Sequence, residues 1–350
     1  MKHVTLASLA IVVALLAGSA GCDRKPRLVP ASADTLAAGT DSLSILSHMA
    51  SERWDAGQTE QASALSARVV RTRLAAVPAG SWEDRARKLL DSLGVACEVA
   101  GAEHAVVVNL FSRSEAEGSS WPYFFWPENG DVRLQLLEGR GMRLLDAAVR
   151  GFDDAGAGDS SRLAVLWGRR AAAGQQPLLL TWRHAHGGRW DLAQTLGPDS
   201  LGGTGAGQFT NQDLITRTFE PTAGFDECPT CPHVLHERRF RWESLGYVRD
   251  DDRVVPSPYA TFASFINALA VGDRATAEKF VADPSLVEFA RRYEWQDPAL
   301  GRWRTAPGTV ENAPEMVFFR GRSDAFRVMF QARGGGWVVL GFESTTRSVE

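Results

Sequence analysis

The sequence predicts an α+β protein, and three successive patterns lead to that prediction. A helical pattern covers residues 41–96, short alternating strands cover 97–255, and two helices followed by three strands cover 256–350. Apolar residues recur every three or four positions in an amphipathic helix and every second position in a half-buried strand. We therefore expect N-terminal helices, a central antiparallel β-sheet or sandwich, and a C-terminal helix pair with a curved antiparallel sheet.

The chain begins with MKHVTLASLAIVVALLAGSAGC, which has the features of a secretory signal peptide. Lys2 supplies positive charge, an apolar run extends from Val4 to about Ala17, and small residues precede Cys22. This run is short for a bilayer crossing, which takes about 20 apolar residues. We assign residues 1–21 to a signal peptide, and a retained transmembrane helix stays open as the alternative.

The small residues Ser19, Ala20 and Gly21 followed by Cys22 resemble the lipobox of bacterial lipoproteins, although Ser19 stands where leucine is usual. The resemblance implies cleavage before Cys22 and a diacylglyceryl group on its sulfur. It also implies an exported protein, anchored by lipid to a bacterial membrane and facing the periplasm or the exterior. Ordinary secretory cleavage, with Cys22 as a plain thiol, is the alternative.

Residues 22–40 are polar, small and proline-containing, as in a flexible tether. The formal net charge is −4, and it becomes about −5 once the signal peptide with Lys2 is removed. Neither sign dominates, so we expect no nucleic-acid partner and no polybasic membrane patch. The expected partners are the membrane, through the lipid anchor, and a protein of the cell envelope.

Helix and strand signals place the elements within these regions. Two helices with a turn at Asp55-Ala56-Gly57 are expected in the first region, and Ser81 is expected to cap a third helix that runs to Gly94. In the second region, Leu163, Val165 and Trp167 recur at every second position, which places them on one face of a strand, and glycine, asparagine and aspartate clusters separate the strands.

The last region begins with a helix whose apolar stripe includes Phe262 and Phe265, and a second helix is expected over 274–293. Three alternating strands follow. A helix pair before a curled antiparallel meander resembles the NTF2-like (cystatin-like) superfamily of α+β cones. This resemblance implies a pocket inside the cone. Its candidate lining residues are Phe262, Phe326, Phe330 and Trp337.

The stretch ECPTCPHVLHERRFRW places Cys228, Cys231, His233 and His236 within nine positions. Covalent haem attachment needs histidine directly after the second cysteine, where this chain has Pro232. Zinc sites usually take two ligand pairs well separated in sequence, so a compact zinc site is the weaker hypothesis. Thioredoxin-like chemistry places such a pair at the start of a helix, whereas this pair leads into an expected strand.

A disulfide between Cys228 and Cys231 is the favoured interpretation, because export would place the chain in an oxidising compartment. Closing so short a loop restricts the unfolded chain by only about 2 kcal/mol, so the bond would pin a local turn. Cys97 has no partner left once Cys22 is lipidated, and we expect a buried, unreactive thiol.

The sequence contains no nucleophile elbow, no His-Glu-x-x-His and no phosphate-binding glycine loop followed by lysine. NTF2-like enzymes of one kind use a histidine with an aspartate, and no histidine follows His236. We therefore expect no catalytic residues, no cofactor and no bound metal. The leading hypothesis is a lipid-anchored envelope protein that binds a protein partner or a small ligand. The alternatives are an NTF2-like enzyme with a small hydrophobic substrate and a structural component of an envelope assembly.

Overall fold

The computed structural model describes most of the chain after residue 39. The described stretches are 40–102, 104–111, 119–139, 141–153, 156–169, 176–211, 213–243 and 246–346. The predicted signal peptide, the tether and Cys22 therefore lie outside the described residues. Within the described stretches, no helix is long and apolar enough to cross a membrane.

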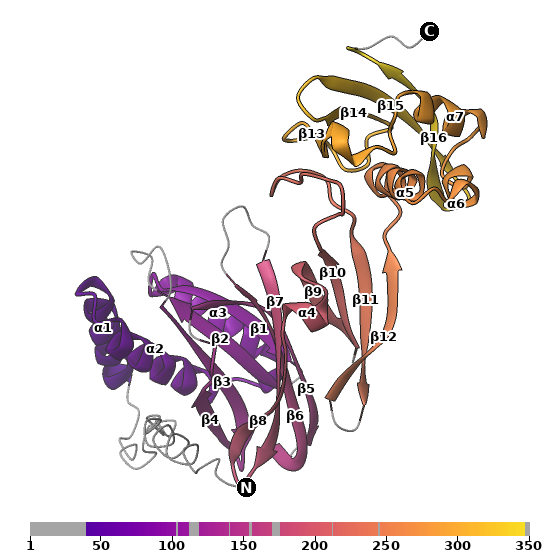
Figure 1. Ribbon diagram of the computed structural model, residues 1–350. Helices are drawn as coiled ribbons and strands as arrows, with labels where there is room; N and C mark the ends of the chain where they lie inside the picture. Colours follow the sequence, from indigo (N-terminus) through magenta and orange to yellow (C-terminus); the bar gives the residue numbers. More distant parts are fainter. Residues whose placement is uncertain are drawn as a thin grey trace, which may run out of the picture. The chain divides into compact units, whose positions relative to one another are not determined.

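Three α-helices form the N-terminal part, and they pack against the first strands of the large sheet (Figure 1). They are α1 (Thr40–Asp55), α2 (Thr59–Leu74) and α3 (Trp82–Ser92), with a 3₁₀ turn η1 (Ala79–Ser81) before α3. The predicted turn between α1 and α2 contains Gly57 with φ of 67°, a conformation that glycine adopts without steric cost. The Trp54 indole donates to Ser66 Oγ at 3.0 Å and joins the two helices.

Helix α3 starts at the expected place, but Ser81 does not cap it with its side chain. The Ser81 hydroxyl instead donates to the Pro78 carbonyl oxygen at 2.8 Å. Glu83 and Asp84 lie in the first turn, where carboxylates interact favourably with the helix dipole.

Twelve strands of the described residues form one antiparallel sheet, which confirms the predicted antiparallel centre. Its first strands are β1 (Ala96–Ala102), β2 (Ala105–Phe111), β3 (Ser120–Glu128), β4 (Asp131–Leu136), β5 (Met142–Asp153), β6 (Gly156–Arg169), β7 (Gln176–His186) and β8 (Arg189–Leu196). After the short helix α4 (Pro198–Leu201) come β9 (Thr204–Thr210), β10 (Asp213–Phe219), β11 (His236–Glu243) and β12 (Gly246–Val254). The order is β1-β2-β3-β6-β7-β9-β10-β11-β12, with β4, β5 and β8 paired to β3, β6 and β7.

Strand β2 shows why part of this sheet has a nearly continuous apolar sequence. Val106 and Val108 pack in the core beneath α2 and α3, whereas Val107 faces a second core within the sheet. Both faces of the strand are therefore buried, and a strand buried on both faces loses the simple alternation of apolar and polar residues.

The C-terminal part combines helices with a four-stranded antiparallel sheet, so the described part of the chain is α+β as predicted. Its elements are α5 (Pro258–Ala270), α6 (Arg274–Glu278), α7 (Ser285–Arg292), the 3₁₀ turn η2 (Pro298–Leu300), β13 (Trp303–Thr305), β14 (Glu315–Arg320), β15 (Asp324–Arg333) and β16 (Gly336–Ser344). Ser257 caps α5 by accepting a hydrogen bond from Ala260 N at 3.0 Å.

Two predictions for this part are wrong in detail. The single helix expected over 274–293 is divided into α6 and α7, because Pro284 has no N–H and disfavours a continuous helix through the preceding residues. The short strand β13 was not expected. It has only three residues, too few for an alternation pattern to be recognised in the sequence.

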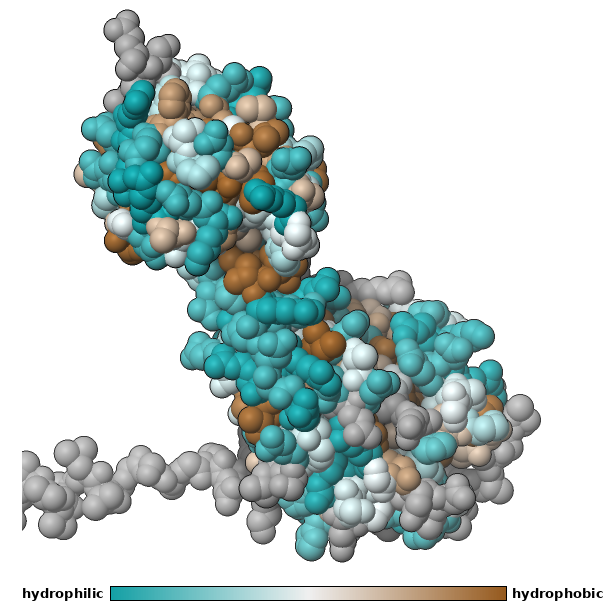
Figure 2. Space-filling view, turned by 90° about the vertical axis from the view of Figure 1, so that its right-hand side faces the viewer, coloured by the Kyte–Doolittle hydropathy of each residue, from teal (hydrophilic) through white to brown (hydrophobic). Residues whose placement is uncertain are grey.

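Aromatic side chains fill the core between α5 and the C-terminal sheet. The Phe262 ring stacks on Phe318 with centroids 3.8 Å apart, and Trp295 and Trp303 contact it edge to face. Outside such cores the surface is polar: hydrophilic residues cover most of the face presented in Figure 2.

Candidate functional site

The loop between β10 and β11 borders a cavity of about 440 Å³. Its wall combines the rings of Phe219 and His233 and the aliphatic side chain of Leu235 with a few polar groups. The polar groups that matter below are those of Arg217, Thr230, Thr309 and Glu311. Cavities of this size, mostly apolar with a few convergent polar groups, are typical of small-molecule sites.

Backbone pairing joins this loop to the C-terminal sheet. Phe225 forms a parallel bridge with Trp303, Asp226 N donates to Trp303 O at 2.6 Å, and Trp303 N donates to Gly224 O at 2.9 Å. The Phe225 ring is buried against Tyr259 and within the same aromatic core. The loop is thus held at its middle, which positions the cavity wall that follows it in sequence.

The two loop cysteines form a tight turn. Their sulfur atoms are 2.13 Å apart, which is disulfide distance, and Cys231 N donates to Cys228 O at 3.0 Å. The geometry agrees with the predicted disulfide and leaves neither thiolate available as a zinc ligand. Cys231 is buried and lines the cavity.

Glu227, directly before the first cysteine, is held as a carboxylate. The Tyr259 hydroxyl donates to Glu227 Oε1 at 2.8 Å, and the Thr222 N–H donates to Oε2 at 3.0 Å. Burial raises the pKa of Glu227, but the neighbouring His233 ring and these hydrogen bonds outweigh it and lower the pKa to about 2. Burial and the same carboxylate raise the pKa of Tyr259.

His233 is the most unusual group in the cavity wall. Its ring stacks on Phe219 with centroids 3.8 Å apart and is only 6% exposed. Nδ1 lies 3.6 Å from Glu227 Oε2, beyond hydrogen-bond distance, and neither ring nitrogen has a hydrogen-bond partner in the part of the chain that the structure describes. The ring therefore contributes an aromatic surface to the cavity wall, and both of its nitrogens are buried away from solvent.

Glu311, which also lines the cavity, differs from Glu227 in the direction of its pKa shift. Burial raises the pKa of Glu311, and His233 and Arg217 only partly oppose this effect. Its carboxylate makes no hydrogen bond or ion pair with any described residue. Arg217, by contrast, pairs with Glu237 at 2.8 Å.

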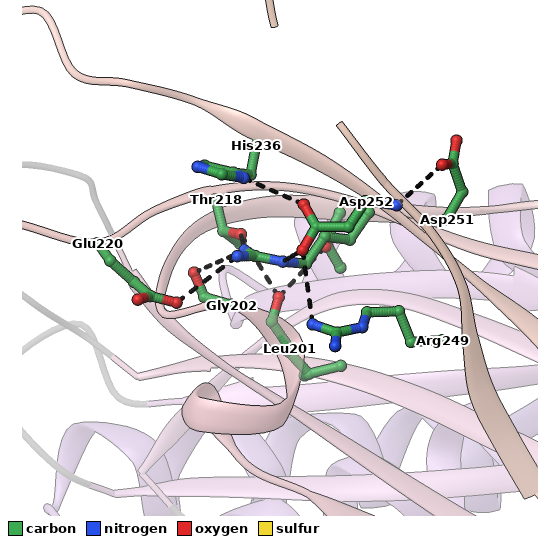
Figure 3. Close-up of polar contacts among 10 residues, drawn as sticks. Leu201, Gly202, Thr218, Glu220, His236, Arg249, Asp251 and Asp252 are labelled. Atoms are coloured by element: carbon green, nitrogen blue, oxygen red, sulfur yellow. Dashed lines mark hydrogen bonds and ion pairs between the residues drawn. The ribbon is translucent and has the colours of Figure 1, made fainter. Parts of the chain in front are cut away.

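A buried arginine supports the base of this loop. Arg238 on β11 donates from Nε to Asp252 Oδ2 at 2.9 Å and from Nη1 to Thr218 Oγ1 at 2.8 Å and Gly202 O at 3.2 Å. Its Nη2 lies 3.6 Å from Glu220 Oε1. Figure 3 shows these acceptors converging from the α4 turn, β10 and β12. The guanidinium thus fixes the strand ends from which the loop departs.

The two histidines of the cluster lie in different environments. His236 Nδ1 is 3.0 Å from Asp252 Oδ1 at the edge of the network in Figure 3, whereas His233 lies in the cavity wall. Burial raises the pKa of Asp252, but the contacts with His236 and Arg238 outweigh it and lower the pKa. Among the described residues, no group of three or more histidine, cysteine, aspartate or glutamate side chains is placed to bind a metal ion.

A second cavity, of about 840 Å³, lies over strands β9 to β12 and is lined largely by charged residues. Its guanidinium groups already have partners. The pairs are Arg239–Asp213, Arg241–Asp250 and Arg253–Glu237, and Arg150 lies 4.8 Å from the Trp242 ring centroid. This surface therefore offers few unpaired charges to a ligand.

The residues expected to line a pocket in the C-terminal part lie together in its aromatic core. Phe262, Phe326 and Phe330 are buried there, and Trp337 is partly buried against them. They line neither of the two cavities described above. Cys97, the free cysteine among the described residues, lies half-buried in β1, and burial first, then Asp91, raises its pKa to about 11.

Glu227, Glu311 and Arg238 were not recognised as site residues from the sequence. The only local signal was the position of Glu227 beside the Cys-x-x-Cys turn. The other residues are brought to the loop by long-range contacts, which leave no periodic pattern in the chain.

Comparisons with protein-family models, with curated proteins and with solved structures found no match to this chain.

Proposed function

We propose that this chain is a lipid-anchored binding protein of the bacterial cell envelope, without catalytic activity, and that a small ligand occupies the cavity beside His233. The lipobox-like start and the polar tether support the location. The single observation that carries the binding role is a cavity of about 440 Å³ with an aromatic wall and few polar groups.

The contacts around the cavity argue against an activated nucleophile. Thr309 Oγ1 donates to Ala306 O at 2.7 Å, and Thr230 Oγ1 lies 3.6 Å from Cys228 Sγ. Nucleophilic catalysis needs a hydroxyl or thiol within hydrogen-bond reach of a base. Neither hydroxyl contacts His233, and both imidazole nitrogens are buried without a hydrogen-bond partner among the described residues.

An enzyme of the NTF2-like kind is the second candidate, and the Glu227–His233 pair is the observation that favours it. A carboxylate next to a histidine can orient and stabilise a general base. The 3.6 Å separation and the shielding of both ring nitrogens weigh against proton transfer to a ligand. Phe262, Phe326 and Phe330 pack against the buried core of the C-terminal part. A substrate inside an NTF2-like cone would have to occupy the space that these rings fill.

The lipid anchor is tested by the mass of the mature N-terminus. Expression in bacteria without globomycin, an inhibitor of lipoprotein signal peptidase, should give a chain beginning at lipidated Cys22, and expression with globomycin should give an uncleaved precursor. Cys22→Ser should abolish the lipid. An unmodified full-length chain in the cytosol would overturn the proposal.

Ligand binding is tested by native mass spectrometry of the protein extracted from membranes. Ala206 is exposed and lines the cavity, so Ala206→Trp should fill part of it at little cost to the fold. We expect a small-molecule adduct on the wild type that the variant lacks. An adduct of equal occupancy on both proteins would contradict binding in this cavity.

A further inference from the structure

We infer that the cavity beside His233 selects a small organic cation, an ammonium group on a short apolar or aromatic body. This inference rests on the proposed ligand-binding role and adds the charge and shape of the ligand. It follows from the charge balance of the cavity, from its aromatic wall and from its size.

One carboxylate in the cavity wall, that of Glu311, forms no ion pair with a described residue, because the nearby arginines pair with other carboxylates. Arg217 and Arg253 both contact Glu237, and the nearby Arg238 contacts Asp252 and Glu220. Glu311 lines the cavity and has no hydrogen bond or ion pair with any described residue.

Glu227 adds a second negative charge behind the wall, because its hydrogen bonds come from the uncharged Tyr259 and Thr222. The guanidinium that lines the cavity, Arg217, is already paired with Glu237, whereas Glu311 is paired with no described residue. An ammonium ligand would pair with Glu311, whereas a carboxylate ligand would meet two like charges without a free arginine.

The aromatic wall suits the same ligand. Phe219 and His233 present a stacked pair of rings to the cavity. A cation within about 6 Å of an aromatic face is attracted by the ring quadrupole, and the apolar body of the ligand gains by burial against Leu235. The hydroxyl oxygens of Thr230 and Thr309 keep lone pairs that can accept hydrogen bonds from an ammonium group.

The size of the cavity limits the ligand to a small molecule. A volume of about 440 Å³ is at the lower end of the range for ligand sites, roughly 300 to 1,000 Å³. A single ring with a short amine side chain fits that volume. For so few atoms, a dissociation constant of about 1 mM is expected of an unoptimised probe.

Three probes of matched shape separate charge from fit: 2-phenylethylamine, 3-phenylpropionate and 2-phenylethanol. Isothermal titration calorimetry on the mature full chain should give the tightest binding for the amine, by about tenfold over the other two. Glu311→Gln should weaken amine binding about tenfold and leave the alcohol unchanged. Glu315→Gln is the matched control, because Glu315 is exposed, pairs with Arg327 and does not line the cavity.

The pH dependence provides an independent readout. Burial raises the pKa of Glu311, so the carboxylate gains its charge at a higher pH than usual. Amine affinity should therefore rise with pH as the Glu311 carboxyl ionises, at a higher pH than for an ordinary glutamate, and Glu311→Gln should remove that rise.

Several outcomes would overturn the inference. If the alcohol or the carboxylate binds as tightly as the amine, the cavity remains a ligand site but does not select a cation. If Glu311→Gln has no effect, or if none of the probes binds at about 10 mM, Glu311 does not define a cation site. Loss of lipidation, measured separately, would instead refute the proposed envelope location.

Discussion

The C-terminal core and the sheet formed by β9 to β12 differ in how much ion pairing accompanies their apolar packing. The first is a continuous cluster of aromatic rings in which Phe262 contacts Phe318, Trp295 and Trp303. The second also buries Leu214, Phe240 and Tyr247, and it carries in addition arginine side chains paired with carboxylates, of which only Arg238 is buried. Burial of rings depends little on pH or salt, whereas ion pairs depend on both.

This difference bears on function because the candidate cavity borders the ionic region. The aromatic core packs its rings against one another and holds the middle of the β10–β11 loop through Phe225. The arginine–carboxylate pairs of β9 to β12 lie mostly near solvent. Glu311, in the wall of the cavity, has no hydrogen-bond or ion-pair partner among the described residues. The tightly packed aromatic core holds the loop rigidly. The cavity wall, in which Glu311 lacks an ion-pair partner among the described residues, can instead bind a ligand.

The largest expected effect is in the aromatic core. Phe262→Ala should lower the free energy of unfolding by about 4 kcal/mol, because the lost ring contacts leave a cavity that the stacked neighbours cannot fill. Urea denaturation measures the change. Leu340→Ala is the control, since Leu340 is 50% exposed on β16 and should cost less than about 0.5 kcal/mol. Similar losses in the two variants would contradict the packing role of Phe262.

Acid should reveal the contribution of Glu227. The folded-state pKa of about 2 lies below the unfolded value of about 4.3, so the folded protein binds fewer protons in this range. The stabilisation is therefore complete above pH 4.3 or so, and it disappears as the pH falls towards 2.

The expected loss is about 2 to 3 kcal/mol in the wild type. Glu227→Gln should be less stable than the wild type at neutral pH and should lack this part of the acid dependence. Denaturation curves at a series of pH values give both quantities, and parallel pH profiles for the two proteins would exclude Glu227 as the source.

Removal of Arg238 should cost about 2 kcal/mol, because charge-assisted hydrogen bonds to Asp252 and Thr218 are lost in a buried position. Arg238→Met keeps most of the side-chain volume, so the loss reports polar contacts. The measured urea midpoint should fall without a change in the slope of the transition. An unchanged midpoint would mean that the network does not stabilise the strand ends.

The smallest effect is expected one residue further along β11. Arg239 is exposed and pairs with Asp213 on the surface, where water and salt screen the interaction. Arg239→Met should leave the urea midpoint within error of the wild type in 0.5 M or so of salt, where the Debye length is only a few ångströms. A loss as large as that of Arg238→Met would show that burial does not explain the difference between the two arginines.

Much of the secondary structure could be predicted because periodicity is a local property. The turn at Gly57, the alternation around Trp167 and the stripe containing Phe262 each required only neighbouring residues. Prediction failed where local signals were weak or were overruled. Pro284 divides a helix that otherwise has a suitable apolar pattern, and β13 is too short to alternate.

The sequence by itself determined the α+β class, the antiparallel centre and the Cys228–Cys231 pairing, because period and short spacing are encoded along the chain. Only the tertiary structure decided that Tyr259 contacts Glu227 from 32 residues away and that Glu311 shares a wall with His233. Such contacts follow from how strands pair and loops dock. Their partners are set by the free energy of the whole fold, and no local pattern specifies them.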